Sequence, residues 1–93
     1  MIELRYDPRF PQDLETALDW YDQVSAEARE KLRGLIQRQL NSIQQFPESF
    51  QPLDSDLDHR GAMVSGFPLM IVFRMEDSVI RILQIVHLSS DWT

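Results

Sequence analysis

The alternation of hydrophobic and polar positions predicts a β-hairpin in the last third of the chain. Residues 67–75 and 79–88 are two runs rich in large apolar side chains, and the polar triplet Glu76-Asp77-Ser78 separates them. Two such runs on either side of a short turn are typical of paired antiparallel strands. Apolar residues occur on both faces of each run, so both faces of the hairpin need cover.

Simple alternation assigns the side chains of this hairpin to two faces. The first face holds Leu69, Ile71, Phe73, Met75, Ile80, Ile82, Val86 and Leu88. The second face holds Met70, Val72, Val79, Leu83 and Ile85. We expect helices to pack on the first face. Met70, Val72, Leu83 and Ile85 are therefore candidate partner-binding residues, the alternatives being a homodimer or cover by the long polar loop upstream.

Two upstream segments repeat apolar residues at helical spacing. The first begins near Phe10 and ends near residue 24, and the second begins after Ser25, its expected N-cap, and ends at Phe46-Pro47. Because only a short connection separates them, they are expected to form an antiparallel pair. The side chains expected in the core are Trp20, Leu32, Ile36, Ile43, Ile71 and Phe73.

Short strands complete the predicted sheet. Residues 2–6 alternate apolar and charged side chains, residues 60–65 form a further strand, and residues 47–59 are expected to form a polar loop. The resulting order, β-α-α-β-β-β, predicts one α+β domain over residues 1–93. In this fold class the antiparallel helix pair packs on one face of a mainly antiparallel sheet.

Composition and charge restrict the classes of function. The 93 residues include no cysteine, the N-terminus has no signal-peptide pattern, and the longest apolar run has five residues. We therefore expect a cytoplasmic protein without a membrane span. The net charge of −6 argues against direct nucleic-acid binding.

An acidic triplet in the polar loop is the one candidate for metal binding. Asp54, Asp56 and Asp58 resemble the start of a calcium loop, which also needs a glycine at its sixth position and an acid at its twelfth. His59 and Ser65 occupy those positions. We therefore expect neither a metal nor another cofactor.

Four basic residues are candidates for catalysis. Arg74 and Arg81 lie about equally far from the predicted turn, so they are expected side by side, where they need an acidic partner. That partner is either an Asp or Glu of the same chain or an anionic group of another molecule. His87 could act as a general base or could have a structural role at the sheet edge, and Arg60 completes the set.

Several segments, taken in order, resemble the RelE/ParE superfamily, the toxin halves of type II toxin–antitoxin systems. Residues 13–25, with the Trp20-Tyr21 pair, are similar to the family's first helix, and residues 40–47 to the end of its second. Arg60, followed after six residues by Phe67-Pro68, and the final strand ending at His87 match later segments. The resemblance spans about residues 3–88 and is stronger for the ParE-like, plasmid-stabilisation branch.

This resemblance implies a partner and a mode of action. In the superfamily an antitoxin neutralises the toxin by wrapping a C-terminal segment over it, which would cover the second face of the hairpin. ParE-like members poison DNA gyrase, whereas RelE-like members cut mRNA on the ribosome. Leu69 and Phe73 stand where tyrosines are common, and the tail after His87 lacks the arginines of many relatives. Metal-free RNA cleavage needs cationic and proton-transferring groups, so these departures argue against it.

Three hypotheses result. The first is a ParE-like toxin that acts by protein–protein contact and is not an enzyme. The second is a metal-independent mRNA endoribonuclease that uses Arg60, Arg74, Arg81 and His87. The third is a degenerate, non-toxic family member that retains only the partner-binding fold.

Overall fold

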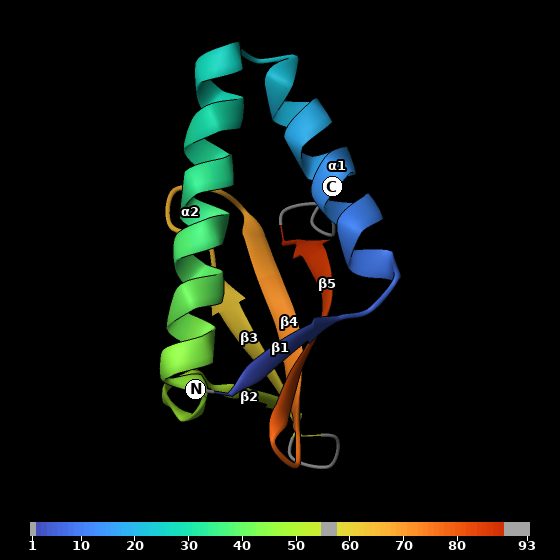
Figure 1. Ribbon diagram of the computed structural model, residues 1–93. Coiled ribbons are helices and arrows are strands. Elements are labelled where there is room, and N and C mark those ends of the chain that lie inside the picture. The colour runs from blue at the N-terminus through green and yellow to red at the C-terminus, as the bar shows by residue number, and fades with distance from the viewer. Residues whose placement is uncertain (1, 55–57, 89–93) are drawn as a thin grey trace.

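Two helices lie side by side on one face of a five-stranded sheet in the computed structural model (Figure 1). The structure describes residues 2–54 and 58–88. The strands are β1 (Glu3–Tyr6), β2 (Pro52–Asp54), β3 (His59–Met63), β4 (Leu69–Glu76) and β5 (Val79–His87). The helices are α1 (Arg9–Asp22) and α2 (Ala26–Gln45), followed by the 3-10 turn η1 (Pro47–Ser49). The predicted α+β architecture is confirmed.

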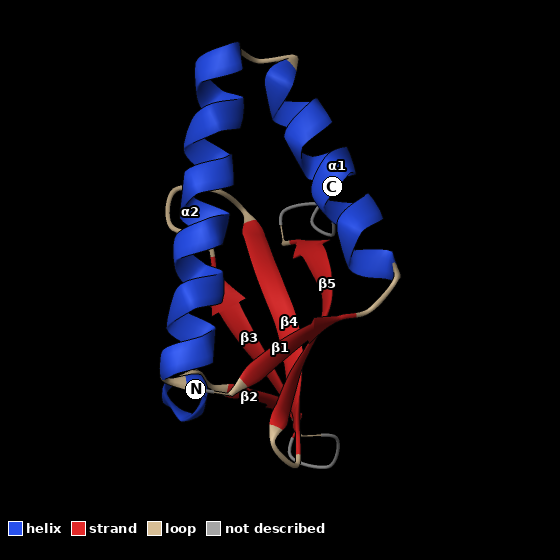
Figure 2. Ribbon diagram, in the orientation of Figure 1, coloured by secondary structure: helices blue, strands red, loops and turns tan. Residues whose placement is uncertain are grey.

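The sheet has the strand order β1-β5-β4-β3-β2. β1 pairs with β5 in parallel, and the neighbours from β5 to β2 pair antiparallel. Both helices lie on the same side of this sheet (Figure 2), so its other side, here called the open face, has no helix over it among the described residues. The predicted hairpin β4–β5 is at the centre of the sheet.

Local signals determine where the helices begin and end. The Ser25 hydroxyl accepts a hydrogen bond from the Ala28 N–H at 2.9 Å, which confirms Ser25 as the N-cap of α2. At the start of α1 the Asp7 carboxylate accepts from the Arg9 N–H at 2.9 Å. α2 ends before Pro47, as predicted, because proline lacks the N–H that would continue the helix.

The core lies between the helix pair and the sheet. Leu32, Ile36 and Ile43 from α2 and Ile71 and Phe73 from β4 are buried there, as predicted. The prediction for Trp20 is wrong, because its side chain is 58% exposed on α1. Its neighbour Tyr21 takes the inward position and packs edge-on against Phe67, with ring centroids 4.9 Å apart. Consecutive helix residues point about 100° apart, so burial of one turns the other outward.

A β-bulge on β5 overturns part of the predicted face assignment. Phe73 pairs with Ile82 and Val72 with Gln84, so Leu83 is an extra residue that has no partner on β4. Ile85 then pairs with Ile71 and packs against the core, whereas Val86 pairs with Met70 on the open face. Simple alternation had exchanged these two residues, because one extra residue reverses every side chain that follows it.

The predicted polar loop over residues 47–59 is also partly wrong, since it contains η1 and the edge strand β2. The Arg60 Nη1 donates a hydrogen bond to the Phe50 carbonyl at 2.7 Å. The Phe50 ring packs edge-on against Phe73 at 5.7 Å. An internal arginine and one aromatic contact therefore attach this segment to the sheet.

Candidate functional site

The open face of the sheet carries a row of basic residues across four strands. The register pairs Arg5 with Arg81, Arg81 with Arg74, and Arg74 with His59. Directly paired residues share a face, so these four side chains, here called the basic row, lie on one line across the open face. The expected proximity of Arg74 and Arg81 is confirmed.

One carboxylate connects the two central arginines. Glu76 accepts hydrogen bonds from the Nε and Nη2 atoms of Arg74, the former at 2.9 Å, and from the Nε of Arg81 at 3.2 Å. These hydrogen bonds lower the pKa of the Glu76 carboxyl below its ordinary value, and the one from Arg74 contributes more than the one from Arg81. Of the two partners considered for this pair, an acid of the same chain is present.

At the edge of the row Arg5 is paired in the same way. Its Nε lies 3.1 Å from a carboxylate oxygen of Glu3, and more than half of each side chain is exposed. An exposed ion pair of this kind contributes little to stability. Arg5 is therefore available to reorient when another charge approaches.

An apolar hollow of about 430 Å³ adjoins the basic row at the β2–β3 side of the open face. The residues lining it are Ser49, Phe50, Gln51, Pro52, Leu53, Gly61, Met63 and Met70. Leu53 is 47% exposed and Met63 is 53% exposed, so apolar surface here is open to solvent. A Cβ atom at position 61 would lie 2.5 Å from the Met70 sulfur and 3.0 Å from a Leu53 methyl carbon. Glycine at this position therefore lets both side chains lie across β3.

The four candidate catalytic residues do not form one site. Arg74 and Arg81 lie together on the open face, but Arg60 pairs with Phe73 and belongs to the helix-covered face. His87 pairs with Leu69 at the opposite end of the hairpin. Leu69 and Arg74 are five residues apart on β4, a separation of about 17 Å along an extended strand. A single phosphate group cannot contact all four side chains.

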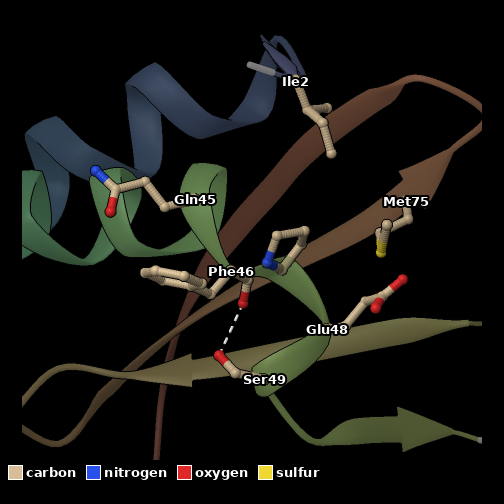
Figure 3. Close-up of a pocket in the computed structure, with 7 residues that line it drawn as sticks. Ile2, Gln45, Phe46, Glu48, Ser49 and Met75 are labelled. Atoms are coloured by element: carbon tan, nitrogen blue, oxygen red, sulfur yellow. Dashed lines mark hydrogen bonds between the residues drawn. The ribbon is translucent and has the colours of Figure 1, made fainter.

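A second hollow, of about 410 Å³, lies where α2 ends (Figure 3). Ile2, Phe46, Pro47 and Met75 form its apolar lining, and Gln45, Glu48 and Ser49 its polar lining. The Ser49 hydroxyl donates to the Phe46 carbonyl at 2.7 Å and closes η1 beside it. Sequence reasoning missed this hollow because its residues come from three separate segments.

The described part of the chain has neither a metal-binding cluster nor a membrane-spanning helix. Within residues 2–54 and 58–88, no three His, Asp or Glu side chains converge to hold a metal ion. The acidic triplet of the predicted calcium-like loop falls partly outside those residues, since Asp56 lies in the segment 55–57. None of the described helices is long and apolar enough to cross a membrane.

Comparison with known proteins gives one family and two informative structures. A family model described as the ParE toxin of type II toxin–antitoxin system, parDE, matches residues 4–92. A structure of the chromosomal ParDE system from P. aeruginosa superposes with a TM-score of 0.83 at 22% identity, over 96% of this chain and 98% of that chain. YafQ from E. coli superposes with a TM-score of 0.60 at 18% identity, over the full length of both chains. No curated protein matches the sequence at a significant level.

Proposed function

The chain belongs to the ParE toxin family of type II toxin–antitoxin systems, and we propose that it acts as a toxin by protein–protein contact and is neutralised by an antitoxin. The single observation that carries the proposal is the open face of the sheet. An apolar hollow and a basic row adjoin each other there, and no described helix covers them. Incompletely covered apolar surface with a charged border is typical of a binding site for another protein.

We propose that the antitoxin covers Met70 and Leu83 on this face. Met70 lines the hollow, whereas Val72, at the next open-face position on β4, is already buried and is left out of the proposed contact. Leu83, the bulge residue of β5, is half-buried and completes the set. Ile85, assigned to the same set by alternation, is left out because it packs against the core.

The cellular target is proposed from the family. We propose that the chain acts in the cytoplasm on a protein target, and that DNA gyrase is the first target to test. Such a toxin would serve plasmid stabilisation or a chromosomal counterpart. The net charge of −6 and the separation of Arg60, Arg74 and His87 support a protein target over cleavage of RNA.

Tightly controlled expression of the chain alone in bacteria tests this proposal. We expect growth arrest with filamentation and induction of the DNA-damage response, and relief of arrest when a candidate antitoxin from a neighbouring open reading frame is co-expressed. Arrest with collapsed translation and cleaved mRNA would instead support the endoribonuclease hypothesis. Normal growth with soluble, folded protein would support a degenerate, non-toxic member and contradict the proposal.

A further inference from the structure

We propose that the open face recognises an acidic partner segment by two adjacent contacts, a carboxylate bound at Arg74 and Arg81 and a large apolar side chain in the hollow beside Gly61. This inference rests on the proposed function, because the segment would belong to the neutralising partner. It goes further by naming the chemistry that the segment must carry.

Charge in the basic row favours a carboxylate. At the centre of the row Arg74 and Arg81 contribute two guanidinium groups and share one carboxylate, that of Glu76. Adjacent like charges across a strand pair are unfavourable, so an additional carboxylate would relieve the repulsion between Arg74 and Arg81. Both central arginines are partly exposed, with 41% and 33% of their side chains accessible.

The guanidinium groups of Arg74 and Arg81 also have more N–H donors than their hydrogen bonds to Glu76 use. Each has five N–H donors arranged in a planar fork that fits a carboxylate through two parallel hydrogen bonds. Arg81 contacts Glu76 through its Nε, so the outer edge of its fork is the part that a partner carboxylate would approach. Exchange of Glu76 for a partner carboxylate would keep the same hydrogen-bond chemistry.

The hollow supplies the second contact and its spacing. Gly61 pairs with Val72, two residues before Arg74, and Met63 pairs with Met70, four residues before it. At ~3.3 Å per residue the hollow and the arginines are about 7–13 Å apart along the strands. An extended segment with an acid two to four residues from a Leu, Ile, Phe or Met spans that distance.

A protein segment fits this surface better than RNA does. Carboxylates at Glu3 and Glu76 alternate with the arginines and would repel a continuous line of phosphates. A protein segment with one acidic side chain would be repelled at one position only. The exposed apolar surface of Leu53 and Met63 also lacks the donors that bind a sugar-phosphate backbone.

Selection of short random peptides displayed on phage against the purified chain tests the inference. We expect enriched peptides to contain Asp or Glu two to four residues from a large apolar residue, and to shift the NMR signals of the Arg74 and Arg81 side chains and of Gly61. Enriched peptides without acids, peptides that bind elsewhere, or no enrichment would each overturn it. Tighter binding of a single-stranded RNA oligonucleotide at the same arginines would overturn it as well.

Three variants, each titrated with one selected peptide, should differ in the direction in which affinity changes. Arg81→Gln should weaken binding about tenfold, the effect of losing a charge-assisted hydrogen bond. Glu76→Gln should tighten binding, because it removes the internal competitor for the same donors. Glu30→Gln removes a Glu–Arg pair of α2, whose Arg33 Nε lies 3.7 Å from Glu30, and should leave affinity unchanged. Weaker binding by a Glu76→Gln variant that remains folded would overturn the proposed exchange of Glu76 for a partner carboxylate.

Failure of this inference is distinguishable from failure of the proposed function. Peptide selection and titration measure recognition by the open face and do not require the chain to be toxic. Growth arrest measures toxicity and does not require an acidic segment. A toxic chain that selects no acidic peptides therefore refutes the inference alone, and a non-toxic chain that selects them refutes only the toxin function.

Discussion

At the scale of single residues, two large apolar side chains of the helix pair differ in how deeply they are buried. Ile43 is fully buried between α2 and the sheet, whereas Trp20 is more than half exposed on α1. Ile43→Ala should lower the free energy of unfolding by about 2–5 kcal/mol, because it removes buried methyl groups and leaves a cavity. Trp20→Ala should change it by less than about 1 kcal/mol. Urea denaturation of both variants measures the difference, and equal losses would contradict the burial of these residues.

The pH dependence of stability should carry a contribution from Glu76. Its pKa is lowered in the folded state by the hydrogen bonds from Arg74 and Arg81, so the folded protein binds a proton at Glu76 less readily than the unfolded chain does. The resulting stabilisation is present above the carboxyl's ordinary pKa of 4.5 and is lost as the pH falls through the lowered folded value. Glu76→Gln should therefore be less stable than the parent protein at neutral pH, and the gap should close in acid.

Chemical denaturation of both proteins across this pH range measures the gap. Glu30→Gln serves as the control, because the Glu30–Arg33 pair is mostly exposed and should show a smaller gap. A difference for Glu76→Gln that persists unchanged in acid would contradict the assigned cause of the pKa shift.

At the scale of elements, the start of α2 depends on one hydroxyl. Ser25→Ala should lower the free energy of unfolding by about 1 kcal/mol, because the Ala28 N–H loses its acceptor. Ser25→Asn provides the matched control, since the asparagine oxygen can accept the same bond and should retain most of the stability. Thermal or urea denaturation distinguishes the two, and equal losses would argue against a capping role.

The bulge in β5 is the element that determines which side chains form the open face. Deletion of Leu83 removes the extra residue and should force Ile85 out of the core or shift the register of the hairpin. We expect this deletion to unfold the domain or lower its unfolding midpoint strongly. Leu83→Ala keeps the residue count and should cost much less. Amide hydrogen exchange across β4 and β5 reports the register, and a deletion variant as stable as the alanine variant would contradict the assignment.

Features that depend on residues close together in the sequence were predicted correctly. Features that depend on more distant parts of the chain were not. Ser25 and Pro47 carry local chemistry, so the helix bounds could be predicted from the sequence. Arg74 and Arg81 lie on the turn side of the bulge, so counting from the turn placed them correctly. Beyond the bulge the same counting assigned Ile85 to the wrong face, because no local sequence signal indicates an inserted residue.

Tertiary packing determined the features that the sequence did not predict. Trp20 and Tyr21 are both plausible core residues, and in the folded chain it is the Tyr21 ring that packs against Phe67. β2 forms because β3 offers it an edge, which a polar segment does not reveal by its own composition. Arg60 was a candidate catalytic residue, but its side chain donates a hydrogen bond to the Phe50 carbonyl within that same polar segment.

At the scale of the whole molecule, one continuous core joins the helix pair to the sheet. Leu32 and Ile36 of α2 belong to the same buried cluster as Phe73 and Ile80 of the hairpin. Neither layer can retain its buried surface without the other, so the domain should unfold in one cooperative step. Helix loss by far-ultraviolet circular dichroism and loss of the Tyr21 side-chain NMR signal should then follow one urea curve. Ile43→Ala should move both curves together, whereas curves that separate would show that the helix pair and the sheet fold as independent units.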